Sequence, residues 1–305
     1  MSIKIKVLGC GSAIPLLGRR PTSQYIQIDQ FEVLLDCGEG TQIQLRKMGV
    51  RFQNIHAICI THLHGDHYLG LPGLLQTLHM LGRRKPLVLV GPVGTWEMLG
   101  LHLNIGNTNL NYPVEFICTQ SEKPEIVWET PLFTIKSIPL KHKIPTTGFF
   151  IEEKIKPRKL IVEKVQFYEV PHYLRNAIKQ GADFEMEDGR VIENAKLTRD
   201  PLPSFNYFFC TDTAFFPDLK NHLPTGISLL YHESSFLEED KEKAEATRHS
   251  TAKQAGSMAK ILEVKQLLLG HYSARYKRTD KHLEEAKTEF ENTTLSFDGY
   301  EIELN

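Results

Sequence analysis

The sequence predicts an α/β fold in which two β-sheets pack face to face and helices cover their outer surfaces. In both halves of the chain, short runs of β-branched and apolar residues alternate with segments of helical periodicity. Two β-rich halves with helices between them are typical of a sandwich of two sheets covered by helices. The length of 305 residues suits one large domain or two small ones.

The first half should begin with a strand at 4–8, followed by a glycine loop at 9–12. Strands at 25–28 and 31–35 flank an Asp29-Gln30 turn and should form a hairpin. Thr41 is expected to cap a helix over 42–48, which Gly49 ends. The pattern then predicts strands at 55–60, 87–90, 114–118, 126–129 and 132–139, and helices at 71–81 and 95–103.

The second half repeats this pattern, with strands expected at 207–210, 227–231 and 266–269 and a helix at 252–262. Between the two halves, residues 152–200 have few apolar runs and many charges, which makes this segment the one clear break in composition.

The composition is that of an ordinary soluble protein, with 41% hydrophobic and 24% charged residues. No apolar run approaches the ~20 residues of a membrane span, and residues 1–7 alternate like a strand rather than a signal peptide. The five cysteines are widely spaced and include no CxxC pair, which predicts reduced thiols, a cytoplasmic location and no cysteine zinc site. The net charge of −1 gives no global sign of a nucleic-acid binder.

Three histidines and one aspartate follow the strand predicted at 55–60: His62, His64, Asp66 and His67. Because side chains alternate along an extended segment, His62 and His64 should point the same way and bind one ion. Gly65 permits a sharp turn, so Asp66 and His67 can face a second position close by. Neutral imidazole and carboxylate are ligands that suit zinc, with iron or manganese as alternatives. We therefore predict a metal site here rather than a solvated strand end.

A site for two ions needs more than four ligands, and three further candidates each follow a predicted strand: His142, Asp212 and His271. Strand ends that meet at one sheet edge would bring these side chains to the cluster. Six other histidines lack this context, and we expect them to be structural or exposed: His56, His79, His102, His172, His222 and His282.

Motifs that span nearly the whole chain carry a family resemblance. They are LGCGSAIP (8–15), LLDCGEGTQ (34–42), THLHGDH (61–67), His142, TDT (211–213), YHESSF (231–236), HST (249–251) and GHYSARY (270–276). HxHxDH marks the metallo-β-lactamase superfamily, which also holds lactamases, thioesterases and sulfatases. LLDCGEGTQ together with HST and HYSARY resembles ribonuclease Z, the family of tRNA 3′-processing endonucleases.

The resemblance implies a metallo-β-lactamase-like αββα sandwich of two mixed β-sheets flanked by helices. It implies one such domain over 1–305, with a protruding tRNA-binding arm inserted at 152–200. Two Zn²⁺ per subunit (or Mn²⁺ or Fe²⁺), no organic cofactor, precursor tRNA as substrate and a homodimer also follow from it. One metal would be held by His62, His64 and His142 and the second by Asp66, His67 and His271, with Asp212 bridging both.

Two metal ions ~3.5–4 Å apart suit in-line hydrolysis of a phosphodiester. The implied reaction is removal of a 3′ trailer, which leaves a 3′-hydroxyl on the tRNA and a 5′-phosphate on the trailer. Asp66 would also accept a proton from the attacking water. His249, steadied by Glu233, would protonate or stabilise the leaving oxygen. The alternative role for the segment of His249 is helix capping by Ser250 and Thr251.

Contacts outside the metal ligands are also predicted. Ser12 should line the path of the phosphate, and Arg275 should pair with a phosphate oxygen. Asp36 and Glu39 are expected to orient ligand histidines.

The arm is where a local basic patch is found. Residues 154–179 hold seven basic residues and two acidic ones, with Phe167, Tyr168 and Tyr173 interleaved, which is typical of RNA-binding surfaces. The segment 170–177 departs from the Gly/Pro-rich tip that many relatives carry. The predicted RNA contacts in the arm are Lys154, Lys156, Arg158, Lys159, Arg175 and Lys179.

Two alternatives to the tRNA endonuclease stay open. One is a dinuclear-metal phosphodiesterase that acts on small diesters, with the arm serving another purpose. The other is a non-catalytic RNA-binding relative, which the complete set of predicted ligands disfavours.

Overall fold

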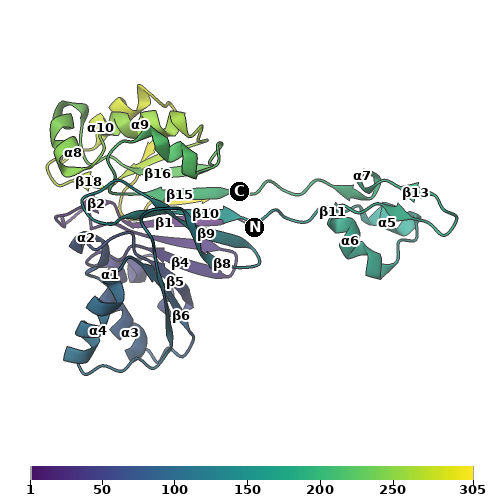
Figure 1. Ribbon diagram of the computed structural model, residues 1–305, viewed down its shortest axis with the longest axis horizontal. Coiled ribbons are helices and arrows are strands. Elements are labelled where there is room, and N and C mark those ends of the chain that lie inside the picture. The colour runs from purple at the N-terminus through teal and green to yellow at the C-terminus, as the bar shows by residue number, and fades with distance from the viewer. Residues whose placement is uncertain (1, 305) are drawn as a thin grey trace. The chain divides into compact units, whose positions relative to one another are not determined.

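The computed structural model describes residues 2–304 and divides the chain into two compact units. Unit 1 comprises Met1–Glu152 and Phe205–Asn305, and unit 2 comprises Glu153–Ser204. Unit 1 confirms the predicted αββα sandwich, because two seven-stranded sheets lie between two groups of helices (Figure 1).

The first sheet has the strand order β20-β1-β3-β4-β5-β6-β7. It is antiparallel from β20 to β4 and parallel from β4 to β7, so it is mixed as predicted. The hairpin expected at 25–35 is present as β3 and β4. The strands are β1 (Ile3–Gly9), β3 (Ser23–Ile28), β4 (Phe31–Leu35), β5 (Ile55–Cys59), β6 (Leu87–Gly91), β7 (Val114–Cys118) and β20 (Glu301–Leu304).

The second sheet has the order β19-β17-β16-β15-β10-β9-β8. Its strands from β19 to β15 are parallel, whereas β10 pairs with β15, and β8 with β9, in antiparallel fashion. The strands are β8 (Glu125–Glu129), β9 (Phe133–Pro139), β10 (Thr147–Glu153), β15 (Asn206–Cys210), β16 (Leu229–Glu233), β17 (Leu267–Gly270) and β19 (Thr293–Leu295). A separate short pair joins β2 (Gly11–Ser12) to β18 (Tyr272–Ser273).

Helices cover both outer faces of the sandwich (Figure 1). On the first sheet they are α1 (Thr41–Lys47), α2 (Gly65–Tyr68), α3 (Leu71–Met80) and α4 (Thr95–Ile105). On the second they are α8 (Lys241–Thr247), α9 (Ala252–Ile261) and α10 (Asp280–Lys287). Short 3₁₀ turns lie at Phe52–Asn54, Pro217–His222 and Glu238–Asp240.

The main core lies between the two sheets and follows from the alternation seen in the sequence. Ile3, Ile5 and Val7 of β1 are fully buried and join one apolar cluster with Phe149 of β10 and Tyr207 of β15. A second cluster lies on the other face of the first sheet, beneath α3 and α4. The two sheets are therefore fixed against each other, and so are the loops that leave their ends.

One prediction about a helix start is wrong. Thr41 is the first residue of α1 rather than its cap, because Gly40 holds the capping position with a φ of 80°. The Thr41 hydroxyl donates to the carbonyl of Gly38 at 2.7 Å. Gly40 satisfies the backbone geometry of the turn without help from a side chain.

Unit 2 has its own small core of six buried residues: Val165, Val170, Ile178, Phe184, Ile192 and Leu197. Its elements are β11 (Lys159–Leu160), α5 (Val162–Phe167), a 3₁₀ turn (His172–Leu174), α6 (Arg175–Lys179), β12 (Phe184–Glu185), β13 (Val191–Ile192), α7 (Asn194–Leu197) and β14 (Thr198–Arg199). Across both units, none of the helices within residues 2–304 is long and apolar enough to cross a membrane. The five cysteines are free thiols, four of them buried.

Candidate metal centre

Four of the predicted ligands come from the segment that follows β5. Ile60 donates its N–H to the carbonyl of Val90 at 2.8 Å, which continues the attachment to β6 past the end of the strand. The chain stays extended through His64, with φ −78° and ψ 143°, and α2 then begins at Gly65. Asp66 and His67 thus lie on the first turn of a helix, at a different angle from His62 and His64.

The other three predicted ligands come from the second sheet. His142 follows β9, Asp212 follows β15 and His271 follows β17. Asp212 and His271 have left-handed backbones, with φ of 48° and 56°. Aspartate and histidine adopt this conformation more readily than most non-glycine residues. The turn takes the backbone out of the strand while the side chain stays at the sheet edge.

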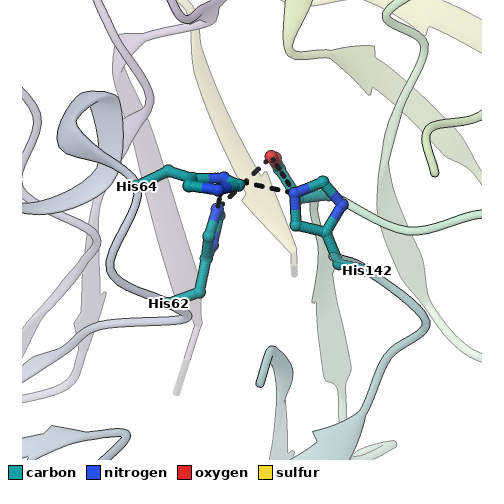
Figure 2. Close-up of side chains that lie close together, drawn as sticks. His62, His64 and His142 are labelled. Atoms are coloured by element: carbon teal, nitrogen blue, oxygen red, sulfur yellow. Dashed lines mark hydrogen bonds and ion pairs between the residues drawn. The ribbon is translucent and has the colours of Figure 1, made fainter. Parts of the chain in front are cut away.

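His62, His64 and His142 converge on one point (Figure 2). The Nδ1 of His64 lies 3.1 Å from the Nε2 of His62 and 3.2 Å from the Nε2 of His142. The Oδ2 of Asp212 lies 3.4 Å from His62 Nε2 and 3.6 Å from His142 Nε2. These four residues form one candidate group of ligands.

Asp66, His67 and His271 form a second group beside the first. The Nε2 atoms of His67 and His271 are 3.2 Å apart, and Asp66 Oδ2 lies 3.4 Å and 3.5 Å from them. The Oδ1 of Asp212 lies 3.3 Å from His67 Nε2 and 2.9 Å from His271 Nε2. Asp212 therefore presents one carboxylate oxygen to each group.

The donor chemistry of both groups fits a transition-metal cation. The Nδ1 of His142 donates to the carbonyl of Arg248 at 2.9 Å, and the Nδ1 of His67 donates to Asp36 at 2.7 Å. With those protons assigned, each Nε2 turns a lone pair toward its group. In each group, the imidazole nitrogens and carboxylate oxygens that could bind a cation lie within 4.8 Å of one another. This set matches the ligands of zinc, iron and manganese.

The pKa values of the ligands are strongly displaced by one another. Burial would raise the pKa of Asp66. The charge of His67 and a hydrogen bond from His271 nevertheless hold this pKa well below its usual range. Burial would lower the pKa of His271, but Asp212 raises it to about 10. Burial and the charge of His67 lower the pKa of His62 to about 3. The imidazoles and carboxylates thus stabilise one another's charged forms, and a divalent cation would supply the positive charge in place of imidazole protons.

Groups behind the ligands fix their orientation. Asp36 is fully buried and also accepts hydrogen bonds from the N–H of Thr61 at 2.8 Å and its hydroxyl at 3.0 Å. Ser235 Oγ lies 3.0 Å from the Nδ1 of His271. The structure therefore brings Asp36 to the predicted ligand His67, but leaves the other predicted residue, Glu39, exposed on the surface.

His249 and Glu233 form a pair at the edge of this cluster. The Nδ1 of His249 donates to Glu233, with distances of 2.9 Å and 3.1 Å to the two carboxylate oxygens. Glu233 is fully buried and accepts a further bond from the N–H of Thr213 at 2.6 Å. Although burial opposes it, the charge of Glu233 raises the pKa of His249. Capping of α9 is a separate role, which Thr251 performs in a capping box with Gln254.

A cavity of about 490 Å³ opens onto the cluster. Its lining includes Ser12, which was predicted to line the path of the phosphate, together with Lys143 and Thr247, which no sequence motif singled out. The position of Lys143 directly after a ligand histidine was the available signal. Arg275 is not among the lining residues; its guanidinium lies 3.5 Å from Asp240.

Comparisons with known proteins agree with this arrangement. The chain is 42% identical to ribonuclease Z of Parabacteroides distasonis over 98% of both chains, and 39% identical to that of Bacteroides thetaiotaomicron over 99% of this chain and 95% of the relative. The chain belongs to the ribonuclease Z family. Among solved structures, human tRNase Z, short form, matches with a TM-score of 0.72 and 26% identity over 99% of both chains.

A family model adds a second likeness. Residues 3–156 match the family described as anti-Pycsar protein Apyc1, so the chain belongs to that family as well. The metallo-β-lactamase fold protein YhfI from Bacillus subtilis shares the fold, with a TM-score of 0.69 and 19% identity over 99% of this chain and all of its own.

The RNA contacts predicted for the arm, residues 152–200, all lie in unit 2. Lys156 pairs with Glu153 at 2.9 Å, and Arg158 pairs with Asp200 at 2.7 Å. Arg175 Nε donates to the backbone carbonyl of Val170, five residues earlier, at 3.4 Å. Lys154 is half-buried, whereas Lys159 and Lys179 are exposed.

Proposed function

We propose that this chain is a metal-dependent endoribonuclease that removes 3′ trailers from precursor tRNA. The observation that carries the proposal is the convergence of seven ligands from both sheets, with the His249–Glu233 pair beside them. A family member with 42% identity over nearly its whole length supports the same activity. A protein that only binds RNA would have no need of this complete set.

Two cations, which we propose to be Zn²⁺ with Mn²⁺ or Fe²⁺ as alternatives, would polarise the phosphodiester and lower the pKa of a water molecule. His62, His64 and His142 would hold one and Asp66, His67 and His271 the other, with Asp212 shared. The chain contributes the geometry of this site. The N–H of Ala13 donates to Asp66 Oδ2 at 2.7 Å, and hydrogen bonds on the far side of the ring orient His67, His142 and His271.

Two side chains would move protons in the reaction. We propose that Asp66 accepts a proton from the attacking water while the oxygen of that water forms a bond to phosphorus. As the bond between phosphorus and the 3′ oxygen of the tRNA breaks, His249 would protonate the leaving oxygen. The Nδ1 of His249 is held by Glu233, so Nε2 is the nitrogen available to the substrate. The products are a 3′-hydroxyl on the tRNA and a 5′-phosphate on the trailer.

The decisive experiment uses precursor tRNA with a 3′ trailer, and maps the cut at nucleotide resolution with zinc or manganese present. We expect one cut at the trailer junction, its loss on chelation, and its loss in Asp66→Ala. Absence of a cut, together with rapid hydrolysis of a small activated diester, would favour the small-diester phosphodiesterase instead.

We further propose that unit 2 binds the tRNA. Its segment 154–179 holds seven basic residues and two acidic ones, and Phe167 and Tyr173 are 75% and 80% exposed. Lysine ammonium groups would neutralise phosphates while exposed aromatic rings stack on bases or ribose. The exposed Lys159, Lys164 and Lys179 are therefore the residues to change.

A triple substitution of these lysines by alanine should raise KM for precursor tRNA and make binding less dependent on salt. Hydrolysis of a small diester should stay the same. The matched control is Lys220, Lys260 and Lys281→Ala, which removes the same charge from exposed positions in unit 1. Equal losses on both substrates would reject the tRNA-binding role of unit 2.

We propose a homodimer from the resemblance to ribonuclease Z, and a cytoplasmic location from the five free cysteines. Sedimentation of the full chain at several concentrations tests the first, and fractionation of the cells that express it tests the second. A monomer at all concentrations would contradict the dimer.

A further inference from the structure

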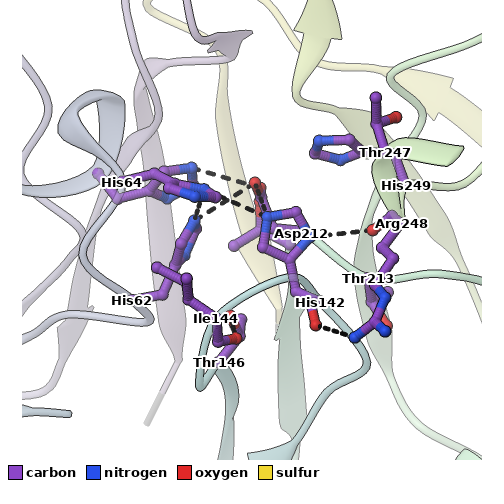
Figure 3. A network of polar contacts seen from close by, with 12 residues as sticks. His62, His64, His142, Ile144, Thr146, Asp212, Thr213, Thr247, Arg248 and His249 are labelled. Carbon is purple, nitrogen blue, oxygen red and sulfur yellow. Dashed lines mark hydrogen bonds and ion pairs between the residues drawn. The ribbon is translucent and has the colours of Figure 1, made fainter. Parts of the chain in front are cut away.

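Arg248 is bonded to the metal ligand His142 at two points (Figure 3). Its backbone carbonyl accepts a hydrogen bond from His142 Nδ1 at 2.9 Å. Its guanidinium Nη1 donates to the backbone carbonyl of His142 at 2.7 Å. Both the imidazole and the backbone of this ligand are therefore held by one residue, which lies far away in the sequence.

The backbone of Arg248 is unusual for an arginine. It has a left-handed conformation, with φ 57° and ψ 49°, directly after α8. Glycine adopts this conformation without the steric cost that a Cβ atom brings. An arginine at this position therefore needs a reason beyond the turn itself, and the bond from its guanidinium to His142 provides one.

The turn that contains Arg248 also carries His249. His249 N–H donates to Ala244 at 2.8 Å, and the hydroxyl of Ser250 donates to the carbonyl of Thr213 at 2.7 Å. The rings of His142 and His249 have centroids 4.9 Å apart. A shift of the turn would therefore move His142 and His249 relative to each other.

We propose that Arg248 is a positioning residue. It orients the imidazole of His142 toward the metal site and fixes the position of His249 relative to His142. The proposal rests on the metal site of the proposed function but not on tRNA as the substrate. The guanidinium restrains the backbone of His142, and the carbonyl of Arg248 selects the tautomer with the proton on Nδ1.

The test compares Arg248→Gly with Arg248→Lys in the full chain. Glycine keeps the backbone carbonyl and relieves the left-handed turn, but it removes the guanidinium. Chelator competition should show that affinity for one of two zinc ions falls about tenfold, as expected when an orienting group is lost. Affinity for the other ion should be unchanged, and kcat should fall with little change in KM. Lysine keeps a cationic donor and should restore most of both losses.

A matched control is Glu263→Gly, which relaxes another left-handed residue, with φ 51°, that follows α9 away from the ligands. It should leave both zinc affinities unchanged. A second readout needs no metal. ¹⁵N NMR of His142 in the metal-free protein should show the proton on Nδ1 in wild type and a mixture of the Nδ1-H and Nε2-H tautomers in Arg248→Gly, because without the guanidinium bond the turn no longer holds the carbonyl of residue 248 against the imidazole.

The outcomes separate the two proposals. Wild-type zinc affinities and an unchanged tautomer in Arg248→Gly would overturn the role of Arg248. An equal loss of affinity for both zinc ions would also overturn this role, since that result indicates a general loss of structure. The wild-type chain could bind no zinc while the Arg248→Gly variant still loses the preference of His142 for a proton on Nδ1. That result would reject the proposed function and leave the positioning role supported.

Discussion

Asp36→Asn is a sharp test of how the site is held together. One carboxylate oxygen of Asp36 accepts from His67 Nδ1 at 2.7 Å, and the other accepts from the N–H of Thr61 at 2.8 Å. Asparagine has one oxygen and one NH₂ group, so it cannot accept from both. In one orientation its NH₂ faces His67 and moves the imidazole proton to Nε2, the nitrogen that should bind the metal. In the other orientation, NH₂ faces the N–H of Thr61.

The size of the effect follows from burial and charge. Asp36 is fully buried, so water cannot replace the lost acceptor. A hydrogen bond to a charged group contributes about 1.5–3 kcal/mol, which is the expected loss in free energy of unfolding. Loss of a group that orients a metal-binding histidine weakens metal affinity by about 10–100-fold.

The assay is chelator competition for zinc, with denaturant unfolding of the same preparation. Ser23→Ala is the matched control, because the Ser23 hydroxyl donates to the backbone carbonyl of Asp36 at 2.8 Å and does not touch its carboxylate. The control should lose some stability and retain its zinc affinity. Wild-type zinc affinity in Asp36→Asn would refute the reasoning that Asp36 sets the tautomer of His67.

Two further predictions concern buried groups. Glu233→Gln removes the charge beside His249 Nδ1, so kcat should fall by about 10²–10⁴-fold, as for loss of a general acid, with KM nearly unchanged in steady-state kinetics. An unchanged kcat would exclude the pair from catalysis. Burial lowers the pKa of His282 from 6.5 to about 4. The imidazole contacts the rings of Tyr272 and Tyr276, and neither of its nitrogens has a hydrogen-bond partner. Its neutral form therefore contributes stability that is complete above pH 6.5 and declines as the pH falls toward 4, by about 3 kcal/mol in total. His282→Leu should flatten the fall in unfolding free energy between pH 7 and pH 5, and an unchanged slope would contradict this assignment.

Much of the fold was predictable because its strands have short, regular patterns. The alternation that predicted the strand at 4–8 became β1, with Ile3, Ile5 and Val7 facing the inter-sheet core. The last strand, β20, was not predicted, since Glu301–Leu304 alternates charged with apolar residues over only four positions. It forms because β1 offers it an open edge, with Ile5 opposite Ile302, and such a tertiary partner cannot be seen in a local pattern.

The candidate ligands were predictable for a different reason. The strand-then-ligand pattern pointed to His142, Asp212 and His271, and all three lie beside the His62–His67 cluster. The contacts that hold them were not predictable. Arg248 reaches His142 only because α8 ends beside the loop after β9, and nothing in the local sequence indicates that approach.

The backbone conformation of three polar residues explains why the pattern of a strand followed by a polar residue could predict the site. Asp36, Asp212 and His271 each follow a strand and each has a positive φ, between 48° and 56°. A left-handed residue other than glycine costs of order 1–3 kcal/mol, and it persists only when its surroundings over-determine it. Here the surroundings are the site itself, because each side chain is fixed by bonds to ligand histidines or carboxylates. The chain thus leaves the sheet at positions where a polar side chain can be held. The end of a strand therefore coincides with a predicted metal ligand at Asp212 and His271, and with a group that orients one at Asp36.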